Sequence, residues 1–285
     1  MPSIRRFPLA CLMLLPFAGT ALAQDPTCEP DKLAEKYPDL VGETITIGAD
    51  PQTPPYVMRA ADDFDKIIGF DADLARAVLD CAGAEYEFFL GGWSGLLPAT
   101  ASGQVDIFWD NLYYTPERAK QVDYVLYMQA GTGGLAASGN PKGFASIADT
   151  CGATVAYGLG TVEEAVVQKQ SEACVADGKE AITTMTYPDV ASGTRLIQSG
   201  RADVMLTDLA LVESFAVDNP DKYASAFKIF SGLNIGAAVR NDNSDLLQAI
   251  YDGLAVMQAD GTQTALFQKY KIDPDMVVTA EIKVD

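Results

Sequence analysis

The chain contains the same motif twice, and this repeat restricts the folds that it can adopt. Residues Ser102–Asp106 and Ser199–Asp203 both read S-G-x-x-D. Each copy leads into a short apolar segment that predicts a strand, at Val105–Trp109 and at Val204–Thr207. Each strand is followed by an aspartate, which in the second copy is Asp208. Two ordinary helix-turn-strand units would give the same pattern by chance, and the alternative is a chain built from two similar halves.

The polar residues after the first of these strands are the main candidates for a binding site. Open α/β sheets bind ligands where the carboxyl end of a strand meets a helix N-terminus. Thr115 is a natural N-cap, and Pro116 suits the first turn of the helix that carries Arg118. A guanidinium suits a carboxylate and Asp208 suits an ammonium, so this pair predicts an α-amino acid as ligand. The other candidates in this segment are Asp110, Asn111 and Tyr113.

Residues 1–23 have the features of a signal peptide. Arg5 and Arg6 form the basic start, an apolar core follows, and Ala21–Ala23 provides a small-residue cleavage site. The apolar run is too short to span a bilayer, and no later stretch is apolar enough to do so. We therefore expect residues 24–285 to be exported to the periplasm.

Charge and composition argue against several classes of protein. The net charge is −19, and it becomes −21 (−19 minus 2) without the two arginines of the signal segment. An acidic surface repels nucleic acid and anionic lipid, so we expect no nucleic-acid partner. The sequence has no histidine, which removes the Ser-His-Asp and Cys-His nucleophile arrangements and the most common acid–base group. We expect a protein that is not an enzyme and that carries no cofactor.

Four cysteines remain after the signal segment, and an even number in an exported chain predicts two disulfides. Three pairings are possible. We favour Cys28–Cys81 and Cys151–Cys174, because each bridge then stays within one half of the chain. A metal site is the weaker alternative, since the sequence has no C-x-x-C motif and no histidine ligand.

Strand and helix patterns alternate along each half, which predicts an α/β protein with two mostly parallel sheets. In the first half, residues 43–48 and 85–90 read as strands, and Asp71 is placed to cap the helix between them. The extended, glycine-containing segments 124–137 and 227–239 read as two strands that cross between the halves.

These crossings divide the chain into two lobes. We expect lobe 1 to comprise residues 24–131 and 237–285, because the C-terminal helices return to it, and lobe 2 to comprise residues 132–236.

Three further positions have both an ordinary and a functional interpretation. Asp50 follows the first strand and is either a turn residue or a carboxylate that faces a cleft. Trp93 is either a core residue or an aromatic wall over a ligand. Gly160 and Thr161 precede a helix, where they form either an ordinary turn or a backbone N–H site for an anion.

The ordered set of motifs resembles the amino-acid family of periplasmic solute-binding proteins, family 3, which feed ABC importers. Each motif alone is weak, but together they span nearly all of the chain after the signal segment, in the family's order. They are G-F-D-x-D-L-A (69–75), W-x-G-L-x-P-A (93–99), S-G-x-x-D (102–106), T-P-E-R (115–118) and A-D-G-T (259–262).

The resemblance implies a type II periplasmic binding fold, in which two lobes close on a small-molecule ligand, and a monomer that then docks on a membrane permease. It implies that Arg118 binds the ligand α-carboxylate and that Asp208 binds the α-ammonium. It also implies that Asp50 meets a polar or cationic ligand side chain. The same resemblance assigns N–H donors to Gly160 and Thr161 and pocket walls to Thr53 and Trp93.

The chain departs from the family pattern inside the pocket. Tyr113 stands where the family usually has a small Ser or Thr, and Asn111 stands where it has Ser or Gly. A basic amino acid, a modified one, or a quaternary amine facing Trp93 all stay open as ligands. Two other functions also stay open: a periplasmic dehydratase of the cyclohexadienyl type on the same fold, and a sensory protein that presents its ligand to a separate receptor.

Overall fold

The computed structural model describes residues 26–284, and the predicted signal segment 1–23 lies outside this range. Over the described range, no helix has the length and apolar character needed to cross a membrane. The nine α-helices of that range are α1 (Leu33–Lys36), α2 (Phe70–Ala82), α3 (Trp93–Ala101), α4 (Pro116–Ala119), α5 (Glu163–Ala176), α6 (Val190–Gln198), α7 (Leu209–Asp218), α8 (Ser244–Ala259) and α9 (Thr262–Lys269).

Strands alternate with these helices, as the α/β prediction requires. They are β1 (Thr44–Ala49), β2 (Gln52–Thr53), β3 (Val57–Arg59), β4 (Ile67–Ile68), β5 (Glu85–Leu90), β6 (Ile107–Phe108), β7 (Val122–Ala137), β8 (Thr154–Gly158), β9 (Thr183–Tyr187), β10 (Val204–Asp208), β11 (Tyr223–Arg240) and β12 (Val277–Lys283).

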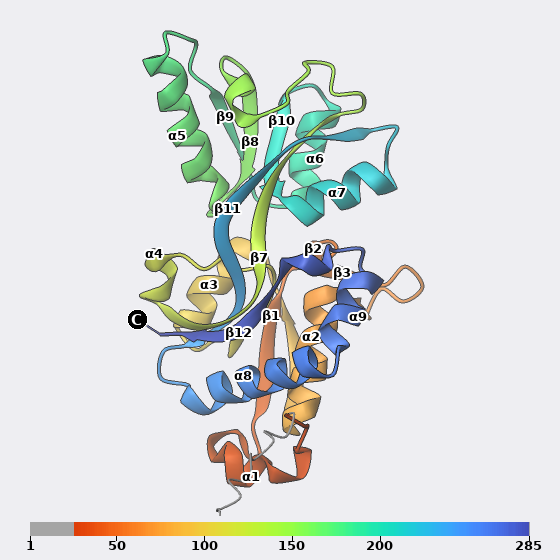
Figure 1. The fold of residues 1–285 in the computed structure, drawn as a ribbon, viewed down its shortest axis with the longest axis vertical. Coiled ribbons are helices and arrows are strands. Elements are labelled where there is room, and N and C mark those ends of the chain that lie inside the picture. Colours follow the sequence, from red (N-terminus) through yellow and green to blue (C-terminus); the bar gives the residue numbers. More distant parts are fainter. Residues whose placement is uncertain (1–25, 285) are drawn as a thin grey trace, which may run out of the picture.

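Two long antiparallel strands, β7 and β11, run through both lobes of the molecule (Figure 1). In lobe 1, the parallel strands β5, β1 and β6 continue onto β11, and in lobe 2 the parallel strands β9 and β8 continue through β10 onto β7. The two predicted sheets are therefore joined into one continuous sheet. The register between β11 and β7 shifts between Phe230 and Asn234, midway along the crossing.

Each lobe has its own hydrophobic core. In lobe 1, α2 and α8 pack on the sheet around buried residues such as Leu74, Ile107 and Leu254. Lobe 2 has separate clusters that include Val155 and Met205. The lobe 1 cluster also includes Ala210 of α7, and the lobe boundaries at 131/132 and 236/237 stay a prediction.

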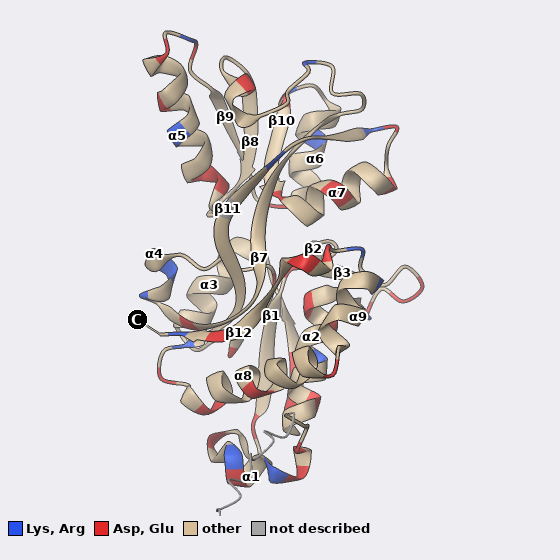
Figure 2. Cartoon of the chain, in the orientation of Figure 1, with Lys and Arg blue, Asp and Glu red and all other residues tan. Residues whose placement is uncertain are grey.

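The structure forms the favoured disulfides, Cys28–Cys81 and Cys151–Cys174, with Cα–Cα distances of 4.6 and 5.5 Å. The first ties the N-terminal arm to α2, and the second ties α5 to the turn before β8. Acidic residues occur over both lobes and outnumber the basic residues (Figure 2).

The S-G-x-x-D repeat has the same structural role in both lobes. The carboxylate of Asp106 accepts from the Thr46 N–H (2.8 Å), and the Asp106 N–H donates to the Thr46 carbonyl (3.2 Å). Asp203 makes the same two bonds with Thr154, at 2.9 and 2.8 Å. Each aspartate thereby fastens the start of its strand to the neighbouring parallel strand. This equivalence favours two similar halves over a chance recurrence.

Two local predictions differ from the structure. The strand expected at Val105–Trp109 is reduced to β6, because the Val105 N–H turns back to a carbonyl of α3. The prediction of Asp71 as a helix cap is wrong. Gly69 is the N-cap of α2, with φ of 129°, and a Cβ there would lie 2.1 Å from the carbonyl oxygen of Tyr56.

Candidate functional site

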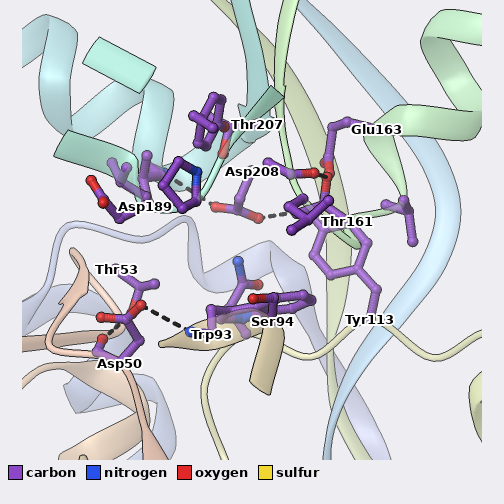
Figure 3. A pocket seen from close by; sticks show the side chains of 18 of the residues that line it. Asp50, Thr53, Trp93, Ser94, Tyr113, Thr161, Glu163, Asp189, Thr207 and Asp208 are labelled. Carbon is purple, nitrogen blue, oxygen red and sulfur yellow. Dashed lines mark hydrogen bonds between the residues drawn. The ribbon is translucent and has the colours of Figure 1, made fainter. Parts of the chain in front are cut away.

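A pocket lies between the two lobes and collects most of the predicted site residues (Figure 3). Asp50, Thr53, Trp93, Asn111, Tyr113 and Arg118 line it from lobe 1, and Thr161 and Asp208 line it from lobe 2. Asp110 and Gly160 contact lining residues but are not part of the wall.

The floor on the lobe 1 side is a network of buried carboxyl groups. Asp50 follows β1 and accepts from the backbone N–H groups of Gln52 and Trp93. Asp110 is fully buried and accepts from the Thr53 hydroxyl (2.6 Å) and the Asp50 N–H (2.7 Å). Burial raises the pKa of Asp50 and raises that of Asp110 well above its usual range. Asp110 therefore positions Asp50 from below the pocket.

Asp71 extends this network towards the core. It is fully buried and accepts from the Asn111 N–H (2.7 Å) and the Tyr127 hydroxyl (2.6 Å). Burial raises the pKa of Asp71 to about 7. Asn111 itself has a left-handed backbone (φ 49°), and its buried side-chain oxygen has no hydrogen-bond partner among the described residues. A strained residue at the pocket wall is typical of a functional site.

Arg118 is held at the pocket as its local sequence predicts. Thr115 is the N-cap of α4, and its hydroxyl accepts from the Arg118 N–H. The guanidinium donates to the carbonyl oxygens of Tyr113 (2.7 Å) and Gly160 (3.0 Å) and lies 5.3 Å from the centre of the Trp93 ring. Burial lowers the pKa of Arg118. Two of its five N–H donors thus bond backbone carbonyl oxygens in the described part of the chain.

The turn before α5 differs from the expected anion site. Gly160 presents its carbonyl oxygen to Arg118, which makes a contact between the lobes. The Thr161 N–H and hydroxyl both bond the carbonyl oxygen of Gly158. The positive φ of Gly160 (77°) sets this orientation. The Thr161 N–H is therefore not free in this arrangement, while an N–H donor role for Gly160 stays a prediction.

Asp208 lies at the C-terminal end of β10 and caps α7. Its carboxylate accepts from the Leu211 N–H (3.1 Å) and from the hydroxyl of Tyr113 (2.7 Å), and it is 4% exposed. Burial raises the pKa of Asp208 to about 6. Tyr113 reaches Asp208 from lobe 1, where the adjoining backbone pairs with β11: the Tyr114 N–H donates to Asn234, and the Gly236 N–H donates to Leu112.

Two acidic residues in the pocket wall were missed from the sequence. Asp189 is the N-cap of α6, a role that accounts for an aspartate at that position without any ligand. Glu163 opens α5, is 4% exposed and accepts from the Thr132 hydroxyl (2.9 Å). The Y-P-D sequence before α6 and the two glutamates at the start of α5 were the sequence features that could have drawn attention to these residues. With them, the described wall has four carboxyl groups and one cation: Asp50, Glu163, Asp189 and Asp208 against Arg118.

Comparison with known proteins gives one consistent result. The L-cystine-binding protein TcyJ of Escherichia coli K12 is 28% identical over 80% of this chain and 82% of its own. ABC transporter arginine-binding protein 1 of the same strain is 28% identical over 77% and 87%. The structure of an ancestral arginine-binding protein bound to arginine is 30% identical and covers 80% of this chain and 97% of its own, with a TM-score of 0.72.

A family model matches residues 45–273, which include both lobes, both crossing strands and the whole pocket wall. The match agrees with the continuous sheet through β7 and β11 and with a pocket that draws on both lobes. The chain belongs to the bacterial extracellular solute-binding proteins, family 3.

Proposed function

We propose that the protein captures an amino-acid-like ligand between its lobes in the periplasm and delivers it to the permease of an ABC importer. The observation that carries this proposal is the charge arrangement of the pocket, where one guanidinium and four carboxyl groups face a single space. A ligand with both a carboxylate and a cationic nitrogen matches both signs. The relatives support the same class, since their names describe binding proteins for cystine and arginine.

Capture follows from contacts that both lobes make with one molecule. The ligand carboxylate binds the free N–H groups of Arg118 on lobe 1, and its cationic nitrogen binds carboxylates of the pocket. A ligand that contacts both lobes stabilises their closed arrangement by differential contact. The closed monomer then docks on the permease after export and removal of residues 1–23.

The test is ligand binding by the wild type and by Arg118→Ala. Residues 24–285 are unfolded and refolded to remove carried-over ligand and then titrated calorimetrically with the amino acids that raise its melting temperature. Losing one partner of a buried charge pair costs ~3–5 kcal/mol, so affinity should fall at least ~100-fold. Arg118→Lys, which keeps the charge but not the planar fork, is the matched control. Normal binding by Arg118→Ala would remove Arg118 from the site.

The alternative of a dehydratase is tested on the same sample. A binding protein leaves prephenate and arogenate unchanged over hours, as followed by absorbance of the aromatic product. Turnover that disappears in Asp208→Asn, whose carboxyl has a pKa of about 6 in the wild type, would establish an enzyme instead.

A further inference from the structure

The carboxylate expected to bind a ligand α-ammonium is already bonded within the protein. The two oxygens of Asp208 accept from the Leu211 N–H and from the Tyr113 hydroxyl, and both Asp208 and Tyr113 are 4% exposed. The hydroxyl of Tyr113 therefore takes one of the hydrogen-bonding positions on Asp208 that an ammonium could use. The nearby Glu163 is equally buried and bonded to Thr132.

The protons at this contact favour a neutral Asp208. The Tyr113 oxygen lies 2.7 Å from Asp208 and 2.5 Å from the carbonyl oxygen of Gly131, yet a hydroxyl has one proton to donate. Both short contacts are satisfied when Tyr113 donates to Gly131 and a protonated Asp208 donates to Tyr113. The pKa of Asp208, which burial raises to about 6, allows this arrangement below about pH 6; above that pH the Tyr113 hydroxyl donates to the ionised carboxylate. A neutral carboxyl group that is donating its proton is a poor partner for an ammonium.

A second pair of carboxylates offers a better site for a cation at the other side of the pocket. Asp50 from lobe 1 and Asp189 from lobe 2 both line the pocket on the side opposite Tyr113 (Figure 3). The charge of Asp189 adds to burial in raising the pKa of Asp50. Each accepts backbone N–H bonds, and neither forms an ion pair within the described part of the chain. A cation placed between them would relieve their repulsion.

Trp93 separates this acidic pair from the guanidinium. Its backbone N–H bonds Asp50, while its ring lies beneath Arg118. A ligand that uses both sites therefore has its two charges on either side of Trp93. In an α-amino acid, the carboxylate and ammonium share one carbon and are much closer together. A carboxylate with its cation at the far end of an alkyl chain spans the required distance.

We propose that the ligand is an ω-amino or ω-guanidino carboxylate that lacks an α-ammonium, with its carboxylate on Arg118 and its cation between Asp50 and Asp189. Tyr113 is then the specificity-determining residue, because its side chain occupies the space beside Asp208 that an α-ammonium would need. This inference rests on the proposed function, since it assigns a ligand class to the same pocket.

The test uses ligand pairs that differ only in the α-ammonium. The refolded wild type is titrated with ε-aminocaproate against L-lysine, with δ-aminovalerate against L-ornithine, and with δ-guanidinovalerate against L-arginine. In at least one pair, we expect the acid without the α-ammonium to bind at least about tenfold more tightly. A smaller difference in every pair, a preference for the α-amino acids, or binding of only other amino acids would overturn the inference while the proposed function stands. No binding by any of these ligands or by the other amino acids would instead reject the proposed function.

A substitution at Tyr113 tests the cause of the preference. Tyr113→Ser should free Asp208 and tighten binding of the α-amino member of the preferred pair by about tenfold or more, with little change for its partner. Tyr113→Phe keeps the ring in place and should retain the wild-type preference. If Tyr113→Ser folds, as judged by its circular dichroism and melting temperature, and keeps the wild-type preference, Tyr113 does not set specificity.

Discussion

The two copies of the repeat begin alike and end differently. Asp106 and Asp203 make the same pair of bonds to a neighbouring strand. After the strands, Asp110 is fully buried beneath the pocket, whereas Asp208 borders the pocket and is bonded across the lobes to Tyr113. Counted from Asp106 and Asp203, Asp208 lies one residue further along than Asp110, and the two acids serve different purposes, because the first supports the site and the second faces it.

The difference lies in what surrounds each acid. In lobe 1, Asp110 and Asp71 hold Asp50 and Asn111 in place through backbone N–H groups. In lobe 2, Asp208 is fixed by its own helix cap and by one side chain of the other lobe. The lobe 1 wall is therefore built with much support from below, whereas the Asp208 contact depends on how the lobes meet.

The largest expected effect is on the pH dependence of stability. A carboxyl group with a raised pKa stays protonated in the folded state while the unfolded state ionises, so stability falls as pH rises from about 4 to the folded pKa. That pKa is about 7 for Asp71 and about 6 for Asp208. At about 1.4 kcal/mol per pH unit, Asp71→Asn should recover up to ~4 kcal/mol above neutrality, and Asp208→Asn up to ~3 kcal/mol.

Urea unfolding at a series of pH values measures both variants. In each variant, the slope of unfolding free energy against pH should become less negative by about 1.4 kcal/mol per pH unit, which corresponds to one proton. For Asp208→Asn this change in slope should extend only to about pH 6, one unit lower than for Asp71→Asn. Unchanged slopes in both would mean that these carboxyl groups ionise normally in the folded protein.

A second prediction compares the stability cost of removing Asp110, which lies beneath the pocket, with that of removing Asp208, which lines it. Asp110→Ala leaves the Thr53 hydroxyl and the Asp50 N–H without their buried acceptor, and should cost about 3 kcal/mol. Asp208→Ala removes mainly a helix cap and should cost about 1 kcal/mol. Chemical denaturation at about pH 4, below the raised pKa values of both folded carboxyl groups, measures both losses without the ionisation effect described above. An equal loss in the two variants would contradict the distinction drawn between the two strand ends.

The smallest effect concerns the shared strand starts. Asp106→Ala removes bonds from both the N–H and the hydroxyl of Thr46 and should cost about 2 kcal/mol. Asp203→Ala removes one backbone bond and an exposed ion pair with Lys142, and should cost about 1 kcal/mol. In a Thr46→Val background the two costs should become similar. A persistent gap would show that the two copies are not equivalent.

The architecture was predictable because its signals are local. Strand patterns, the recurrence of S-G-x-x-D and the glycine-containing crossings together predicted an α/β protein with two lobes. The joining of both sheets into one was not predicted, since it depends on the pairing of β7 with β11 along their whole length. Asp71 was misassigned because a helix-start pattern does not reveal that Gly69 already fills the cap position.

The sequence predicted the placement of a site residue only where the local chain determines the direction of its side chain. Thr115 and Pro116 start α4, and this places Arg118 at the pocket. Asp189 and Glu163 are recognisable in the sequence as acids at helix starts, but the packing of lobe 2 on lobe 1 that brings them to the pocket has no local sequence signal. The orientation of the Gly160 carbonyl also depends on a contact between lobes, so an N–H donor and a carbonyl acceptor could not be told apart in advance.

The backbone pairing of the segment that carries Tyr113 has a mechanical consequence. Hydrogen bonds from Tyr114 to Asn234 and from Gly236 to Leu112 fasten this segment to β11 just beyond the register shift between Phe230 and Asn234. Irregular positions in paired strands are where a sheet bends. A change in the angle between the lobes at this point therefore displaces Tyr113 directly, through the main chain. Opening the molecule and releasing Asp208 from Tyr113 are one movement rather than two.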